Sequence, residues 1–156
     1  MRRKQNLAID IKEQWDMDGK RILMIDDDPD YVNAVKMVLE KANYAVETTY
    51  SPQDGYRALE NSEFDLVILD CMMGRGAEGI IVARKLRKKK ELGELPILMI
   101  TGIRDQTGFF FVGDPKDETY LPVDGFLEKP VVPDVLLKEV GKLLQGRKTN
   151  EPKKGD

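Results

Sequence analysis

The sequence predicts an α/β fold in which helices cover both faces of a doubly wound parallel sheet. Short apolar runs alternate along the chain with amphipathic stretches, and this alternation is typical of a parallel sheet wrapped by helices. Three of the runs are nearly continuous in apolar residues, as strands covered on both faces are. With 156 residues, the chain has room for one domain of ordinary size and not for a second.

Five segments of the chain are predicted to be strands. The first, third and fourth are the nearly continuous apolar runs, whereas the second and the fifth show that character less. The five predicted strands are Arg21–Ile25, Ala45–Thr49, Asp65–Leu69, Pro96–Ile100 and Gly125–Leu127.

Four segments are predicted to be helices, because apolar side chains recur in them at helical spacing. Three of the helices open with a proline, and in two of these a capping side chain precedes it. The predicted starts are Asp28-Pro29, Ser51-Pro52, Ile80 and Pro133. The basic run Arg87–Lys90 closes the third helix and is interpreted as a solvated end, since the helix dipole favours cations there.

Segment 104–122 lies where a helix would be expected between the fourth and fifth strands. It contains two glycines and two prolines and shows no sustained helical stripe. We therefore expect an irregular loop in place of that helix. Its three consecutive phenylalanines, Phe109–Phe111, either pack back onto the core or form an exposed patch for a partner.

The composition excludes several classes of protein. A net charge of −3 is the opposite of the basic footprint that phosphate backbones require, so we expect no direct contact with nucleic acid. Without histidine and with the single cysteine Cys71, an internal disulfide and the usual zinc sites are excluded. No stretch resembles a signal peptide or a membrane span, and a cytoplasmic protein is expected.

Polar side chains follow the predicted strands at the points where the strands end. The carboxyl ends of parallel strands face the ligand crevice of an open sheet. Asp26–Asp28 follow the first strand, Asp70 the third, Thr101 the fourth and Lys129 lies beyond the fifth. Carboxylates, a hydroxyl and an ammonium should therefore converge on one edge of the sheet.

This set of side chains suits phosphoryl chemistry. Crowded carboxylates repel one another unless a cation neutralises them, and Mg²⁺ prefers oxygen ligands of this kind. Asp70 can then offer one oxygen as a nucleophile to a phosphoryl group, while Lys129 and the Thr101 hydroxyl stabilise charge on the phosphoryl oxygens. Asp28 precedes Pro29 at a helix start and is interpreted as a helix cap rather than a ligand.

Four motifs stand in order at these strand ends. They read Ile22-Leu-Met-Ile-Asp-Asp-Asp-Pro29, Leu66-Val-Ile-Leu-Asp-Cys-Met-Met73, Pro96-Ile-Leu-Met-Ile-Thr-Gly102 and Gly125-Phe-Leu-Glu-Lys-Pro-Val131. At these residues the sequence resembles the receiver domain of two-component response regulators, over about residues 20–146. The resemblance implies a flavodoxin-like five-stranded sheet with the strand order 2-1-3-4-5.

The resemblance also implies a metal-ligand set. Asp70 would be the phosphorylated residue and would contribute to a Mg²⁺ site. Asp27 would be a direct ligand, Asp26 a partner mainly through water, and the main-chain carbonyl of Met72 a further ligand.

Two further features follow from the resemblance. Thr101 would move toward the aspartyl phosphate, and Phe126 would occupy the aromatic switch position whose rotamer reports that move. The Lys129-Pro130 bond is expected to be cis, which is the minority form of X-Pro bonds in general.

Residues 20–146 are expected to form the receiver, flanked by a polar extension, 1–19, and a disordered tail, 147–156. The chain would be either a stand-alone regulator or an intermediate of a phosphorelay, and the sequence does not choose between them. The receiver would take a phosphoryl group from a sensor histidine kinase or a histidine phosphotransfer protein and signal by protein contacts. Such a domain is no enzyme in the usual sense, although it catalyses its own phosphorylation and autodephosphorylation. The downstream target and the oligomeric state, a homodimer included, stay open, and no membrane partner is expected.

The chain departs from the family pattern in two places. Met73-Gly74 stands where a Met-Pro pair is frequent, and the loop up to Gly79 is about one residue longer than usual, so it is expected to be more mobile. Segment 104–122 replaces a helix that belongs to the usual output face. That segment leaves open a receiver-like interaction module that no longer depends on phosphorylation.

A second alternative comes from another class of protein. Asp26–Asp28 can be matched to the Asp-x-Asp pattern of haloacid-dehalogenase-type phosphatases, with Asp26 as the nucleophile. The match is incomplete, because Pro29 stands where a threonine or valine is usual and Asp70 would have no role.

Overall fold

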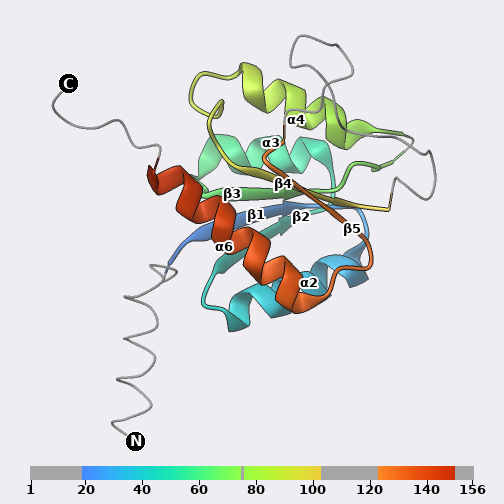
Figure 1. Ribbon diagram of the computed structural model, residues 1–156. Coiled ribbons are helices and arrows are strands. Elements are labelled where there is room, and N and C mark those ends of the chain that lie inside the picture. The colour runs from blue at the N-terminus through green and yellow to red at the C-terminus, as the bar shows by residue number, and fades with distance from the viewer. Residues whose placement is uncertain (1–18, 75, 103–122, 150–156) are drawn as a thin grey trace, which may run out of the picture.

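The computed structural model describes residues 19–74, 76–102 and 123–149 (Figure 1). Five strands form one parallel sheet in the order β2-β1-β3-β4-β5, which confirms the predicted flavodoxin-like α/β fold. The strands are β1 (Arg21–Ile25), β2 (Ala45–Thr49), β3 (Leu66–Leu69), β4 (Ile97–Thr101) and β5 (Gly125–Glu128). The helices in the described ranges are α2 (Pro29–Lys41), α3 (Pro52–Asn61), α4 (Glu78–Lys88) and α6 (Pro133–Thr149).

The strand predictions agree with the structure to within one residue at each end. The second and fifth strands, which have the weakest apolar character, are both present at the edges of the sheet. Edge position explains their composition, because a strand with one neighbour needs less cover than a central one. By contrast, every residue of β3, at the centre of the sheet, is buried.

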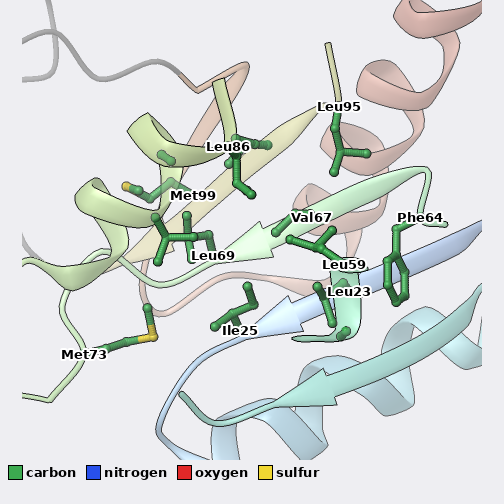
Figure 2. Packing of buried hydrophobic residues seen from close by; sticks show 14 of the residues in the cluster. Leu23, Ile25, Leu59, Phe64, Val67, Leu69, Met73, Leu86, Leu95 and Met99 are labelled. Atoms are coloured by element: carbon green, nitrogen blue, oxygen red, sulfur yellow. The ribbon is translucent and has the colours of Figure 1, made fainter. Parts of the chain in front are cut away.

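The helices form two layers, one on each face of the sheet (Figure 1). Alternate residues of a strand point to opposite faces, so β1 supplies Leu23 and Ile25 to one core and Ile22 and Met24 to the other. The first core lies under α3 and α4 (Figure 2). The second core lies under α2 and α6. No helix in the described part of the chain is long and apolar enough to cross a bilayer.

Helices α2, α3 and α6 begin where the sequence predicts, whereas α4 begins at Glu78, two residues before the predicted Ile80. The Asp28 side chain accepts hydrogen bonds from the amides of Asp30 and Tyr31, and Pro29 is the first residue of α2. The Ser51 side chain caps α3 in the same way through the amide of Asp54. Each cap satisfies amides that would otherwise lack a partner at the helix start.

Of the basic run predicted to be a solvated helix end, Lys88–Lys90 are exposed as expected, whereas Arg87 at the end of α4 is not. Arg87 donates hydrogen bonds to the carbonyl oxygens of Gly93 and Leu95, at 3.1 and 2.6 Å. It also pairs with Asp124, whose carboxylate accepts from the amide of Ile97 at 2.8 Å. Arg87 therefore ties α4 to the segment before β4 and to the residue before β5. The sequence pattern does not reveal the contact with Asp124, because the two residues are 37 positions apart.

Three predicted segments lie wholly or largely outside the described residues. These are the extension, the irregular loop over 104–122 and the tail. The predicted start of the tail differs from the structure, because α6 continues to Thr149 and residues 147–149 are helical.

The start of α4 packs unusually closely on the end of β3. A Cβ atom added at Gly79 would lie 1.9 Å from the carbonyl oxygen of Asp70, and the Gly79 amide donates to the carbonyl oxygen of Cys71 at 2.9 Å. Only glycine allows this approach, which places the N-terminus of α4 directly against the residue that follows β3.

Two helical glycines should respond to alanine in opposite directions. Gly79→Ala should lower the free energy of unfolding by about 2–3 kcal/mol, because backbone must move to admit the methyl group. Gly141→Ala, in α6 with nothing within 4 Å of the added Cβ, should raise it by about 0.5–1 kcal/mol through helix propensity. Urea denaturation followed by circular dichroism measures both, and equal effects would contradict the close approach at Gly79.

Candidate functional site

The sheet brings two acidic residues to adjacent strand ends. β1 and β3 are neighbours, with Ile25 opposite Leu69 in the register, so Asp26 and Asp70 leave the sheet side by side. The amide of Asp70 donates to the carbonyl oxygen of Ile25 at 3.0 Å. The backbone therefore fixes the separation of these two side chains.

Asp27 completes a cluster of three carboxylates. One carboxylate oxygen each from Asp26, Asp27 and Asp70 can be chosen so that all lie within 4.8 Å of one another. Asp26 and Asp70 are only 1% and 6% exposed, whereas Asp27 is exposed. The cluster is thus open to solvent on the Asp27 side and closed behind.

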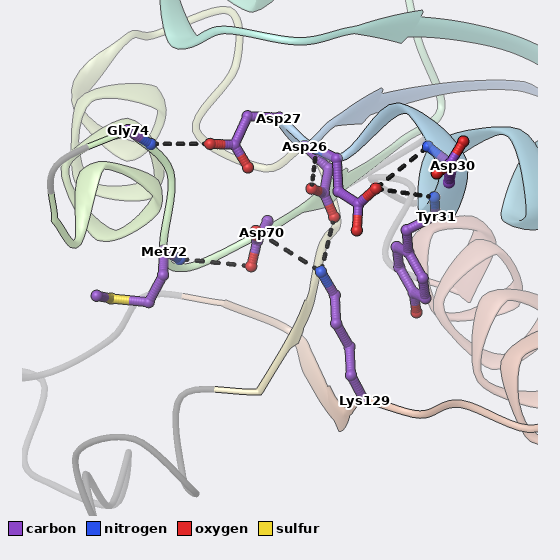
Figure 3. A network of polar contacts seen from close by, with 9 residues as sticks. Asp26, Asp27, Asp30, Tyr31, Asp70, Met72, Gly74 and Lys129 are labelled. Carbon is purple, nitrogen blue, oxygen red and sulfur yellow. Dashed lines mark hydrogen bonds and ion pairs between the residues drawn. The ribbon is translucent and has the colours of Figure 1, made fainter.

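Lys129 supplies a positive charge to the cluster from the end of β5. Its Nζ lies 3.0 Å from Oδ2 of Asp26 and 3.7 Å from Oδ2 of Asp70 (Figure 3). The Lys129-Pro130 peptide bond that follows is cis. The strand order places β5 two strands away from β3, so the lysine side chain reaches back over the edge of the sheet.

Main-chain amides also contact the cluster. Oδ1 of Asp26 accepts from the amide of Asp28 at 3.0 Å, and Oδ2 of Asp27 accepts from the amide of Gly74 at 3.0 Å. The amide of Met72 approaches Oδ1 of Asp70 at 3.4 Å. Each carboxylate is therefore oriented by a neutral donor, and two of these donors lie in the loop after β3.

That loop is closed on itself at the side of the cluster. Gly74 has a φ of +59°, a conformation that glycine adopts without strain. Met73 and Gly76 exchange main-chain hydrogen bonds of 3.1 and 3.3 Å around it. The turn directs the Gly74 amide at Asp27. This explains why a glycine follows Met73 in this chain.

The structure brings some of the predicted site residues together and does not test the position of others. Asp26, Asp27, Asp70 and Lys129 meet, and Asp28 caps α2 as interpreted from the sequence. Thr101 ends β4 opposite Glu128, but its side chain is outside the described part of the structure.

Phe126 is half-buried in β5 and packs against the core under α3 and α4. Its role as a switch and that of Thr101 stay predictions. The same holds for the main-chain carbonyl of Met72 as a ligand.

One side chain beside the cluster was not predicted. The centroid of the Tyr31 ring lies 4.2 Å from Nζ of Lys129 (Figure 3). Burial, together with the charges of Asp26 and Asp70, raises the pKa of Tyr31 to about 12, so its phenol stays neutral near pH 7. Its helical spacing suggested only a packing role, and no local pattern reveals that its ring faces a lysine about a hundred residues away.

The residues of the cluster fit a magnesium ion. The Lys129 ammonium offsets one of the three carboxylate charges. Two negative charges remain, and a divalent cation would neutralise them. All of the side-chain donors are oxygens, and two oxygens on an octahedral Mg²⁺ stand about 3–4 Å apart, close to the spacing within this cluster. The open Asp27 side leaves room for the waters that Mg²⁺ retains.

A parallel sheet in the order 2-1-3-4-5 that carries three aspartates and a lysine at its carboxyl edge defines the class of two-component receiver domains. The family model described as the response regulator receiver domain matches residues 22–141. The chain belongs to this family.

Similar sequences among well-described proteins support membership of this family. VanR of Enterococcus faecium, a regulatory protein, is 29% identical over 120 residues, which are 77% of this chain and 48% of VanR. PilH of Pseudomonas aeruginosa is 28% identical over 129 residues, 81% of this chain and 98% of PilH. The chain spans about half the length of the first curated relatives it matches.

Solved structures show the same fold. The response regulator TrrA of Thermotoga maritima, in complex with Mg(2+)-BeF, has a TM-score of 0.66 at 28% identity, with 80% of this chain and 98% of that chain covered. A CheY-like receiver domain protein from Methanospirillum hungatei JF-1 has a TM-score of 0.70 at 24% identity, with 85% and 99% covered. The second likeness supports the fold alone.

Cys71 follows Asp70 and should be chemically inert in the folded protein. Its side chain is fully buried, and burial with the charge of Asp70 raises the pKa of the thiol to about 12. A higher pKa means less thiolate, which is the reactive form. We expect Ellman's reagent at pH 8 to label Cys71 slowly in buffer and rapidly in urea, and equally rapid labelling in both would contradict the burial.

Proposed function

We propose that this chain is a phosphoacceptor in which Asp70 takes a phosphoryl group from a sensor histidine kinase or a histidine phosphotransfer protein, with Mg²⁺ at the acidic cluster. The observation that carries the proposal is the meeting of Asp26, Asp27, Asp70 and Lys129 at one edge of the sheet. Membership of the receiver family gives this cluster its reaction class.

The roles follow from where each group lies. An oxygen of Asp70 attacks the phosphorus atom, the bond from phosphorus to the donor breaks, and the donor leaves with the electron pair of that bond. The Lys129 ammonium, 3.7 Å from Oδ2 of Asp70, is within reach of the incoming phosphoryl oxygens and stabilises their charge. The Thr101 hydroxyl is assigned the same task and Phe126 the switch position.

Asp26, Asp27 and Asp70, with the Met72 carbonyl, are the residues that would hold Mg²⁺. When bound, the ion supplies charge neutralisation at the carboxylates and at the transferred group. The similarity to TrrA, which was solved in complex with Mg(2+)-BeF, supports this assignment.

The phosphatase alternative is less well supported, because Asp26 is poorly suited to be the nucleophile. Both of its oxygens are engaged at 3.0 Å, one by the amide of Asp28 and one by Lys129. The side chain is also almost fully buried. Family membership removes the remaining reason to prefer that reading.

The alternative of a phosphorylation-independent module loses support as well. A chain that no longer needed the reaction would have no need to keep three repelling carboxylates together. The cluster is complete, with a lysine beside it.

Output through protein contacts is the arrangement we propose for this receiver. PilH, matched over 98% of its length, is a relative in which the matched region is nearly the whole protein. The kinase or phosphotransfer partner follows from the reaction class and is part of the proposal.

The first test is the identity of the phosphorylated residue. With Mg²⁺ and acetyl phosphate, intact-mass measurement should show the addition of one phosphoryl group, and peptide mapping should place it on Asp70. Asp70→Asn should abolish the gain in mass, because an amide is not a nucleophile here. Undiminished labelling of that variant, or a phosphoryl group on Asp26, would contradict the assignment.

The second test concerns the metal. Asp27→Ala should lower the Mg²⁺ affinity at least about tenfold, since it removes a ligand from the solvent side of the cluster. Asp28→Asn is the matched control, because it removes a neighbouring charge outside the cluster and an asparagine still caps α2. Isothermal titration calorimetry measures both variants, and equal losses would mean that general charge, rather than the cluster, binds the ion.

A further inference from the structure

The ammonium of Lys129 lies over the face of the Tyr31 ring. The distance from Nζ to the ring centroid is 4.2 Å, well inside the range of about 6 Å in which a cation is attracted by an aromatic face. Asp26 and Asp70 hold the same ammonium at 3.0 and 3.7 Å. Lys129 is thus surrounded by two carboxylates and one aromatic face (Figure 3).

The backbone of Tyr31 is tied to the acidic end of β1. Its amide donates to Oδ1 of Asp28 at 3.3 Å, and the amide of Asp28 donates to Asp26 at 3.0 Å. The ring therefore starts from a chain segment that is fixed relative to the cluster. It is the first turn of α2, rather than a loose loop, that presents the ring to Lys129.

The hydroxyl group of Tyr31 does not explain why an aromatic residue stands here. The oxygen is buried and makes no hydrogen bond to any residue that the structure describes. Burying a hydroxyl without a partner costs free energy. The ring face, in contrast, contacts the Lys129 ammonium. A phenylalanine would supply this face equally well.

We propose that Tyr31 is a positioning residue for phosphoryl transfer and acts by holding the Lys129 ammonium beside Asp70 with its ring. This inference rests on the proposed function. A carboxylate alone would draw the ammonium into a fixed ion pair, and in doing so withdraw it from the phosphoryl oxygens. An aromatic face attracts the cation without occupying the N–H groups that point away from the ring, so these remain directed to the site.

The test compares two substitutions at one position. Tyr31→Leu keeps an apolar side chain but removes the aromatic face, and should lower the rate of phosphorylation by acetyl phosphate about fivefold, the value of one partly buried cation–π contact. Tyr31→Phe restores the ring and should restore the rate. Thermal unfolding of both variants shows whether each is folded, and Tyr31→Met, a flexible apolar side chain, replaces the leucine variant if that one is not.

A spectroscopic readout separates positioning from general packing. In the wild type and in Tyr31→Phe, the ring should shift the ε-methylene proton resonances of Lys129 upfield, and the shift should disappear in Tyr31→Leu. Lysine labelled with ¹³C makes these resonances visible, and their absence from Lys129→Arg assigns them. Identical Lys129 resonances in wild type and Tyr31→Leu would overturn the proposal.

The outcomes distinguish this inference from the proposed function. If the wild type takes up no phosphoryl group, the proposed function fails and the inference fails with it. If the wild type is phosphorylated and Tyr31→Leu reacts at the same rate, the inference alone is overturned. A slower Tyr31→Leu with the rate restored in Tyr31→Phe, together with the loss of the resonance shift, supports it.

Discussion

The repulsion among three carboxylates is the constraint on which the rest of the site depends. Oxygens of Asp26, Asp27 and Asp70 lie within 4.8 Å of one another, and two of the three side chains are buried. For a pair of unit charges at that distance, an effective dielectric constant of about 20 gives a repulsion of about 3 kcal/mol. Folding must supply this free energy, and the Lys129 ammonium at 3.0 Å from Asp26 offsets part of it.

The backbone holds the carboxylates in place against that repulsion. β1 and β3 are paired along four residues, up to the residues just before Asp26 and Asp70. Behind them, Gly79 lets α4 approach the carbonyl oxygen of Asp70 so closely that no side chain fits between. The amide of Gly74, in the loop between β3 and α4, donates to the carboxylate of Asp27. The cluster is therefore built mainly from main-chain geometry, which side-chain repulsion cannot easily relax.

Local patterns in the sequence predict most of this fold, because its strands and helix starts are determined by residues that are close together in the chain. Apolar runs identify the strands, and Asp28-Pro29 marks the start of α2. The convergence of Asp26, Asp70 and Lys129 follows from one topological rule about parallel strand ends. Contacts between side chains distant in sequence were missed: Arg87 looks like a solvated cation, and Tyr31 looks like one more apolar position of a helix. The position of Thr101 at a strand end predicts its place at the site, but the switch roles of Thr101 and Phe126 rest on the family resemblance, since neither composition nor spacing indicates them.

The position of Lys129 links the chemistry to the edge of the sheet. Among the strands that the structure describes, β5 pairs with β4 alone. It carries the half-buried Phe126 and, just beyond its end, the lysine that contacts Asp26 and Asp70. If Asp70 takes up a phosphoryl group as we propose, the added negative charge changes the balance of forces on the Lys129 ammonium, because the two groups are only 3.7 Å apart. An edge strand has fewer neighbours to hold it than a central strand. Any displacement of Lys129 is therefore accommodated more readily by β5 than by β1 or β3.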